Sequence, residues 1–161
     1  QPMAILLENM SDEYMREIAG YFASLPYTYP KQVTHALSPA DIRSVETLMY
    51  SGDPERDLPA CSACHGEALM GVEPYIPGLL GLPHAYVAAQ FGGWRNGGIM
   101  RGQIPDCMSE IAKKLTQEEV NALALWLPSR PLSGDVAKAD ALAAELAQRC
   151  RTVVSGEEVT R

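Results

Sequence analysis

The stretch ACSACHG, Ala60–Gly66, holds two of the four cysteines and one of the three histidines of this 161-residue chain. Cys61, Cys64 and His65 form a CxxCH pattern. Three kinds of site use such a cluster: a structural zinc site, a redox-active dithiol, and the covalent attachment point of a c-type haem. The surrounding sequence discriminates among them.

The zinc and dithiol alternatives lack the context that each requires. A structural zinc site takes four N or S ligands, usually as two separated pairs, and the remaining cysteines, Cys107 and Cys150, do not form a second pair. A thioredoxin-like dithiol belongs to a βαβ unit, whereas residues 52–59 (GDPERDLP) are loop formers. Haem attachment needs two thiols one helical turn apart and a histidine directly after the second. The stretch supplies all three.

The composition is that of a globular protein with an acidic surface. Hydrophobic residues make up 47% and charged residues 20% of a chain long enough for one complete domain and part of a second. The formal charge of −7 excludes nucleic acid as a partner and favours a basic protein surface. No apolar run is long enough to predict a transmembrane segment. Because Gln1–Met3 starts no signal-peptide pattern, we expect any export signal to be absent from this sequence.

Two segments of the chain repeat each other. Residues 3–26 (MAILLENMSDEYMREIAGYFASLP) align without a gap on residues 108–131 (MSEIAKKLTQEEVNALALWLPSRP), at a constant offset of 105 positions. Both begin with methionine, place a capping hydroxyl (Ser11 or Thr116) before an amphipathic helix, and end in Ser-x-Pro. We therefore expect residues 1–26 to end a first, incomplete domain whose own CxxCH would precede Gln1, either truncated from this sequence or lost.

A histidine-ligated haem iron takes a sixth ligand or keeps an open site, and methionines after His65 are candidates for that ligand. Met70 follows His65 too closely to pass to the opposite haem face. Met100 lies in a glycine-rich loop and remains an alternative, whereas Met108 is favoured because Met3 is its counterpart in the repeat. Met3 itself is either a first-domain iron ligand or an ordinary methionine near a chain end.

Helix caps and apolar periodicity coincide in four segments of the chain. They predict helices at residues 38–50, 83–95, 116–126 and 135–150. Residues 27–37 (YTYPKQVTHAL) contain helix breakers and β-prone residues and are interpreted as an extended linker. Since no segment shows the period of a strand, the fold class is expected to be all-α.

Several runs, in this order, resemble the second half of a cytochrome c4: residues 50–66 (YSGDPERDLPACSACHG), 76–79 (IPGL), 85–91 (AYVAAQF), 94–97 (WRNG) and 108–115 (MSEIAKKL). The resemblance covers residues 3–131. It implies a dihaem class I cytochrome c of the bacterial periplasm, with helices wrapped around covalent haem. The expected parts are the end of a first cytochrome c domain (1–26), a linker (27–37), a haem domain (38–131) and a C-terminal helical extension (132–161).

The resemblance also assigns roles by position. It implies that Cys61 and Cys64 bind haem c, that His65 and Met108 are the metal ligands, and that the Pro77 carbonyl orients the His65 ring. It also implies that Tyr86 and Trp94 line the haem, with ordinary core aromatics as the alternative. Arg95 and Gln90 match polar family positions that contact a propionate or the domain interface, and a solvated helix face is the alternative for Gln90. The chain departs from the family at Leu82, where glutamine is usual, in the loop before Met108, and after Pro131.

The expected function follows from the ligand set. A His/Met-ligated iron has no open position for substrate, so we expect one-electron transfer rather than enzyme catalysis. The alternative is a haem subunit bound tightly within a respiratory dehydrogenase or oxidase complex; an enzyme with an open haem site is a third class. Redox partner proteins or a membrane respiratory complex are the expected partners.

The expected haem content is one covalently attached haem c in this chain, with a second if an upstream domain exists. Covalent haem attachment indicates the periplasm, on the oxidising side of the bacterial membrane. In that compartment Cys107 and Cys150 either form a disulfide or remain two thiols.

Overall fold

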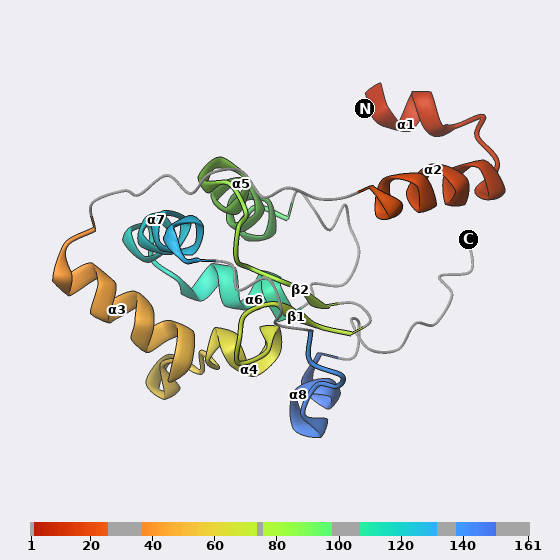
Figure 1. The fold of residues 1–161 in the computed structure, drawn as a ribbon. Coiled ribbons are helices and arrows are strands. Elements are labelled where there is room, and N and C mark those ends of the chain that lie inside the picture. Colours follow the sequence, from red (N-terminus) through yellow and green to blue (C-terminus); the bar gives the residue numbers. More distant parts are fainter. Residues whose placement is uncertain (1, 26–36, 74–75, 98–106, 132–137, 151–161) are drawn as a thin grey trace.

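A computed structural model describes residues 2–25, 37–73, 76–97, 107–131 and 138–150, and it is mostly helical (Figure 1). The α-helices are α1 (Pro2–Leu7), α2 (Asp12–Ser24), α3 (Pro39–Tyr50), α4 (Cys61–His65), α5 (His84–Arg95), α6 (Cys107–Lys114), α7 (Gln117–Trp126) and α8 (Ala144–Arg149). The shorter elements are the 3₁₀ helices η1 (Pro54–Arg56) and η2 (Leu127–Ser129) and the strands β1 (Gly71–Val72) and β2 (Ile76–Pro77). Met100 and most of the expected linker, residues 27–36, lie outside the described residues. In the described part of the chain, no helix has both the length and the apolar character that crossing a membrane requires.

Three predicted helix positions are confirmed. Ser38 caps α3, and its Oγ accepts the backbone N–H of Asp41 at 3.1 Å. Thr116 caps α7 through a capping box: its Oγ accepts the N–H of Glu119 at 3.1 Å, and the Glu119 carboxylate accepts the N–H of Thr116 at 2.7 Å. The helix predicted at residues 83–95 is α5. Local capping chemistry therefore sets where these helices begin.

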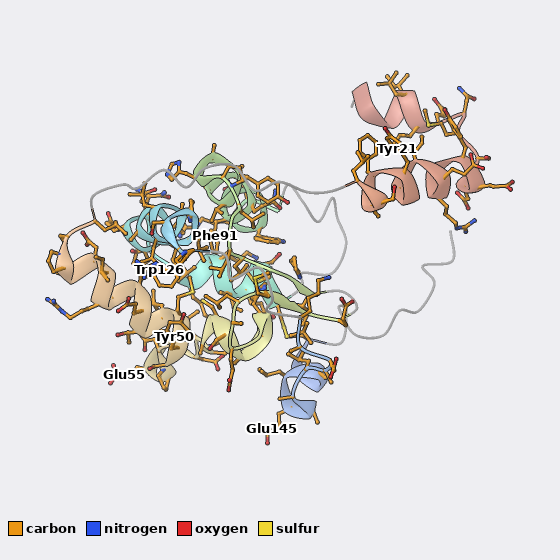
Figure 2. All side chains as sticks on the ribbon, viewed as in Figure 1. Tyr21, Tyr50, Glu55, Phe91, Trp126 and Glu145 are labelled. Carbon is orange, nitrogen blue, oxygen red and sulfur yellow. A yellow bond between two sulfur atoms is a disulfide. The ribbon has the colours of Figure 1, made fainter. Side chains whose placement is uncertain are left out.

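One apolar core joins α3, α5 and α7. Its buried side chains are Val45, Leu48, Met49, Leu58, Leu69, Val87, Leu115, Val120, Leu123, Ala124, Trp126 and Leu127. Figure 2 shows Trp126 and Phe91 within this body and Tyr50 and Glu55 toward its outside. Because each large apolar side chain stabilises the fold by about 1.5–3 kcal/mol when fully buried, this core holds the three helices together.

A small hairpin adds β-structure to the otherwise helical fold. Gly71 pairs with Pro77 and Val72 pairs with Ile76, antiparallel. Because each strand has only two residues, it is too short to show the alternation of apolar and polar residues by which a strand is recognised in a sequence. Gly71 has φ +97°, and a Cβ at this position would lie 2.5 Å from the carbonyl oxygen of Ile76. The two strands can therefore approach only with glycine at this position.

The predicted C-terminal helix over 135–150 is wrong for residues 138–143, because α8 covers only Ala144–Arg149. Ala139 instead lies beside β1. Its N–H donates to the Gly71 carbonyl at 3.0 Å, and its own carbonyl accepts the N–H of Glu73 at 2.8 Å. These long-range backbone hydrogen bonds override the helical spacing of the local apolar residues, an outcome that local propensity does not foresee.

A disulfide joins Cys107, the first residue of α6, to Cys150, which follows α8. The S–S distance is 2.03 Å. Of the two alternatives that the sequence leaves open for these cysteines, the structure contains the bridged one. The C-terminal extension is thereby linked covalently to the helix that begins next to Met108.

The repeat found in the sequence is also present in the structure. At the offset of 105 positions, the first residue of α1 falls on the first residue of α6, and α2 falls on α7 together with η2. Ser24 Oγ donates to the Tyr21 carbonyl at 2.8 Å, just as Ser129 Oγ donates to the Trp126 carbonyl at 2.6 Å. The two segments are therefore the same structural unit in two places.

The two copies differ in burial. Tyr21 and Phe22 of α2 are 61% and 65% exposed, whereas their counterparts Trp126 and Leu127 are 1% and 2% exposed. Figure 1 shows α1 and α2 apart from the other helices, and Figure 2 places Tyr21 on this pair. Helices α1 and α2 thus present the apolar face that α6 and α7 bury in the core.

A group of charged side chains ties the loop before α4 to the corner between α6 and α7. The Arg56 guanidinium donates to the Glu119 carboxylate at 2.7 and 3.0 Å, to Asp53 at 2.6 Å and to the Lys114 carbonyl at 3.4 Å. The Lys114 ammonium in turn donates to the Asp57 carboxylate at 2.9 Å. Bidentate arginine–carboxylate pairs are directional, so this group holds the loop before α4 against the end of α6 and the start of α7.

Acidification is expected to weaken this tie. The hydrogen bond from Arg56 lowers the pKa of Glu119 below its usual 4.5, so the stabilisation is present above that value and is lost as the pH falls through the lowered pKa. We expect the free energy of unfolding of the haem-loaded protein to decrease below about pH 4.5, and to decrease less steeply in Arg56→Met. Denaturant unfolding at a series of pH values measures both slopes. Arg43→Met, at an exposed position of α3, is the control; equal slopes for the Arg56 variant and the native protein would contradict the assignment.

Candidate functional site

A cavity of about 220 Å³ lies inside the helical body. Side chains of α3, α4, α5, α6 and α7 line it, and its walls are almost entirely apolar. Cys61, Cys64 and His65 face it from α4, and Met108 faces it from α6. The fold therefore brings the CxxCH stretch and the favoured methionine to the walls of one cavity.

The CxxCH stretch forms a helix of its own, α4. Cys61 and Cys64 are one turn apart on it, so both side chains reach the same cavity wall. Burial raises the pKa of the Cys61 thiol to about 11. Redox-active dithiols need a lowered thiol pKa, so this environment is unfavourable to a thioredoxin-like role.

His65 is buried, and one hydrogen bond fixes its ring. Its Nδ1 lies 2.8 Å from the carbonyl oxygen of Pro77 in β2, which is the contact that the family resemblance implied. A carbonyl can only accept, so Nδ1 carries the proton and Nε2 is left with a free lone pair. Burial lowers the pKa of His65, which keeps the ring neutral. A neutral imidazole with a free Nε2 is the form that binds a metal ion.

The methionine candidates have different positions. Met108, in the first turn of α6, lines the cavity. Met70 is partly buried, and it is not among the described residues that line the cavity. Met3 belongs to α1, but its side chain lies outside the described part of the structure, as does Met100.

Three curated proteins show similarity over most of the chain. The thiosulfate dehydrogenase electron acceptor of Thiomonas intermedia is 31% identical over 81% of this chain and 59% of its own length. The protein of the same name from Stutzerimonas stutzeri is 36% identical over 77% of this chain and 55% of its own length. Cytochrome c4 of Pseudomonas aeruginosa is 30% identical over 78% and 60%. The chain thus spans little more than half the length of these relatives, and no protein-family model matches it.

Solved structures give the same result for the fold. Thiosulfate dehydrogenase (TsdBA) from Marichromatium purpuratum superposes with a TM-score of 0.62 and 32% identity, over 80% of this chain and 27% of that chain. Reduced recombinant cytochrome c4 from Pseudomonas stutzeri superposes with a TM-score of 0.59 and 29% identity, over 80% and 65%. The chain is a homologue of the cytochromes c4. Its fold is that of a class I cytochrome c, and its cofactor is haem c.

The cavity of this cytochrome c4 homologue fits haem c in its chemistry. Its apolar walls suit a macrocycle that must be kept from water, two thiols lie together on one helix, and an imidazole with a free Nε2 follows them. The side chain of Met108 provides a thioether on another helix. Attachment groups and two metal-binding atoms of the expected kinds are therefore present in one place.

The other expected site residues divide between two locations. Tyr86, Gln90 and Trp94 of α5 line the cavity, and Tyr86 is also 50% exposed, which places it at the surface. Arg95 is not among the described lining residues. Its guanidinium donates to the carbonyls of Ala112 and Leu115 and to the Gln117 side chain. In this structure Arg95 therefore ties α5 to the corner between α6 and α7.

Sequence reasoning missed the apolar part of the site. The additional lining residues are Leu48, Met49, Leu58, Pro59, Ala60, Gly78, Leu79, Leu82, Val87, Phe91, Ile111, Leu115, Leu123 and Leu127. Leu82, noted in the sequence only as a departure from the family, is one of them. The spacing of those that lie in α3, α5, α6 and α7 marks a buried helix face. It does not show whether that face meets another helix or a cofactor.

Gly71→Ala tests whether the hairpin supports the site. A Cβ at Gly71 meets Ile76 O at 2.5 Å and Gly78 N at 2.8 Å, on both sides of Pro77. We expect the free energy of unfolding of the haem-loaded protein to fall by about 1–3 kcal/mol from the backbone conformation alone. The His65 Nδ1 proton resonance should also shift in NMR spectra, because the Pro77 carbonyl moves. Denaturant unfolding and NMR provide these measurements.

Gly92→Ala is the matched control for this substitution. Gly92 lies in α5, and a Cβ there has no neighbour within 4 Å. The free energy of unfolding should stay the same or rise by up to about 1 kcal/mol. If Gly71→Ala behaved like this control, the hairpin would not constrain Pro77.

Proposed function

We propose that this chain is a c-type cytochrome that transfers one electron at a time through haem c held by Cys61, Cys64, His65 and Met108. The observation that carries the proposal is the convergence of these four side chains, from α4 and α6, on one apolar cavity. The electron-transfer names of its relatives support it. Haem c supplies the reversible Fe(II)/Fe(III) couple.

Each residue has a distinct task in this proposal. The sulfurs of Cys61 and Cys64 form the two thioether links that hold the group in place. His65 provides Nε2 as the iron ligand, with Pro77 keeping its ring oriented and raising its basicity. Met108 would provide a thioether sulfur as the second protein ligand of the iron, and a thioether ligand favours the reduced state and raises the potential.

The ligand set explains why transfer of an electron, rather than catalysis, is the proposed activity. If the His65 imidazole and the Met108 thioether both bound the iron, the iron would have no open position for a substrate. The apolar walls keep water and its reorganisation away from the redox centre. The half-exposed Tyr86 marks where the site comes closest to the surface on α5.

A second, more specific candidate is the electron-accepting partner of a thiosulfate dehydrogenase, either as a free protein or as a bound subunit. Two relatives are named as thiosulfate dehydrogenase electron acceptors, and the thiosulfate dehydrogenase from Marichromatium purpuratum contains a region with this fold. The net charge of −7 favours a partner with a basic docking surface.

The proposed location is the periplasm, with membrane association only through a partner complex. Covalent haem attachment belongs to that compartment. The Cys107–Cys150 disulfide supports it, since disulfides persist in oxidising compartments and are rare where thiols are kept reduced.

The proposed domain division keeps residues 38–131 as the haem domain. Residues 1–26 are proposed to be the C-terminal end of a first, incomplete cytochrome c domain, because α1 and α2 match α6 and α7 and leave their apolar face exposed. Met3 is the proposed iron ligand of that domain. Residues 132–161 form a C-terminal extension; in its described part, residues 138–143 are not helical and Ala144–Arg149 form α8.

Met108→Ala tests the ligand assignment. We expect the variant to retain covalent haem, because both thioether links remain, but to lose the far-red sulfur-to-iron absorption band of the ferric protein. Without the thioether, the reduction potential should fall by roughly 0.1–0.3 V. Visible spectroscopy and a redox titration measure both effects.

Met70→Ala is the control for this variant, because Met70 follows the same attachment helix without lining the cavity. Its far-red band and potential should match those of the native protein. A band that survives in Met108→Ala would assign the sulfur ligand to Met100 and contradict the role given to Met108.

Reduction by thiosulfate and a thiosulfate dehydrogenase tests the partner. A free carrier should be reduced rapidly, with a rate that falls roughly tenfold between low and physiological ionic strength because the acidic surface steers the encounter. A bound subunit should instead copurify with the dehydrogenase in high salt. Stopped-flow spectroscopy and size-exclusion chromatography distinguish the two. Failure of the dehydrogenase to reduce the protein at any salt concentration would reject this partner while leaving the general electron-transfer role intact.

A further inference from the structure

The C-terminal segment, defined as residues 138–150, contacts two separate parts of the structure around the proposed haem site. One end pairs with the hairpin that orients His65. The other end is bonded to the residue next to Met108. Two independent sets of observations support these contacts.

The first contact is with β1. Ala139 exchanges two backbone hydrogen bonds with this strand, at 3.0 and 2.8 Å, through Gly71 and Glu73. Lys138 and Glu73 add an ion pair at 3.2 Å between two exposed side chains. Because β1 pairs with β2, which contains Pro77, the segment supports the hairpin that holds the His65 ring.

The second contact is with α4 and α6. Leu146 of α8 faces Pro59, Cys64 and Ile111 across a void of only about 10 Å³. Cys64 and Ile111 also line the main cavity, so α8 packs behind that part of its wall. Cys150, 7% exposed, then closes the disulfide with Cys107.

The disulfide acts where α6 begins. Met108 is the second residue of α6, and residue 107 directly before it is the bonded cysteine. The far end of α6 is held separately, by hydrogen bonds from Arg95 to the carbonyls of Ala112 and Leu115. Among the described residues, the disulfide is therefore the covalent restraint on the end of α6 that includes Met108.

We propose that the Cys107–Cys150 disulfide is a positioning device that keeps Met108 on the iron. Cys107 and Cys150 act through Met108 and touch neither the iron nor an electron partner. The proposal rests on the proposed function in taking Met108 as the sulfur ligand. Breaking the disulfide frees the amino-terminal turn of α6, and the thioether then leaves the iron more often.

The first experiment uses the haem-loaded double variant Cys107→Ser/Cys150→Ser. We expect imidazole, which enters only when the thioether has left, to bind the ferric protein roughly tenfold faster than in the native chain. On heating, the far-red band should disappear below the temperature at which the helical circular dichroism is lost. Lys138→Met, which removes an ion pair at the other end of the segment, is the matched control and should show neither change.

A disulfide that serves only global stability gives a different result. The far-red band and the helical signal would then be lost together at a lower temperature, and the imidazole rate would equal that of the native protein. That outcome overturns the proposal.

The second experiment covers the case in which the double variant does not fold. The native haem-loaded protein is treated with a phosphine reductant in sub-denaturing urea, its two new thiols are blocked with a maleimide and counted by mass spectrometry, and the iron is reoxidised. The imidazole rate should rise as in the variant; an unchanged rate with both thiols blocked overturns the proposal. A native protein that lacks the far-red band, or a Met108→Ala variant that keeps it, overturns the ligand assignment instead, so the two failures are distinguishable.

Discussion

The hydrogen bond from His65 to the carbonyl of Pro77 is the contact on which the arrangement of the site depends. It selects the ring tautomer, because a carbonyl cannot donate, and so leaves the lone pair of Nε2 available for the proposed metal ligation. It also requires a hairpin tight enough to hold Pro77 beside α4, which only glycine at position 71 permits. A backbone feature two residues long therefore determines the chemistry of a side chain twelve positions away. The short strands have little stability of their own, and Ala139 adds a third backbone partner to them.

Two arginines from different parts of the chain both bind the corner between α6 and α7. Arg56 reaches this corner from the loop before α4, and Arg95 reaches it from α5. Both donate to backbone carbonyls at the end of α6, which a helix leaves without internal partners. Positive charge at this end also complements the helix dipole. The same contacts satisfy the helix terminus and hold the carboxyl-terminal end of α6 against α5 and the loop before α4.

Local signals in the sequence were sufficient for much of this architecture. The caps at Ser38 and Thr116 marked the starts of α3 and α7, and the repeat at an offset of 105 positions reappeared as matching helices and matching hydrogen bonds. What failed depended on contacts between distant parts of the chain. Residues 138–143 have helical spacing, but Ala139 among them pairs with β1. The carbonyls that Arg95 binds, those of Ala112 and Leu115, were not foreseen either. No local sequence pattern predicts which backbone carbonyl an arginine side chain will bind.

The apolar lining was missed for a different physical reason, which concerns how this core is built. Leu48, Met49, Leu58, Val87, Leu123 and other core residues line the cavity and also pack against one another. Without a group that fills this space, these apolar side chains would lack part of their packing partners, which lowers stability. A group that fills the space with apolar contact therefore completes the core, and its binding free energy adds to the free energy of folding. Core residues and cofactor-lining residues are then the same residues, so a sequence pattern that finds the first cannot separate the second.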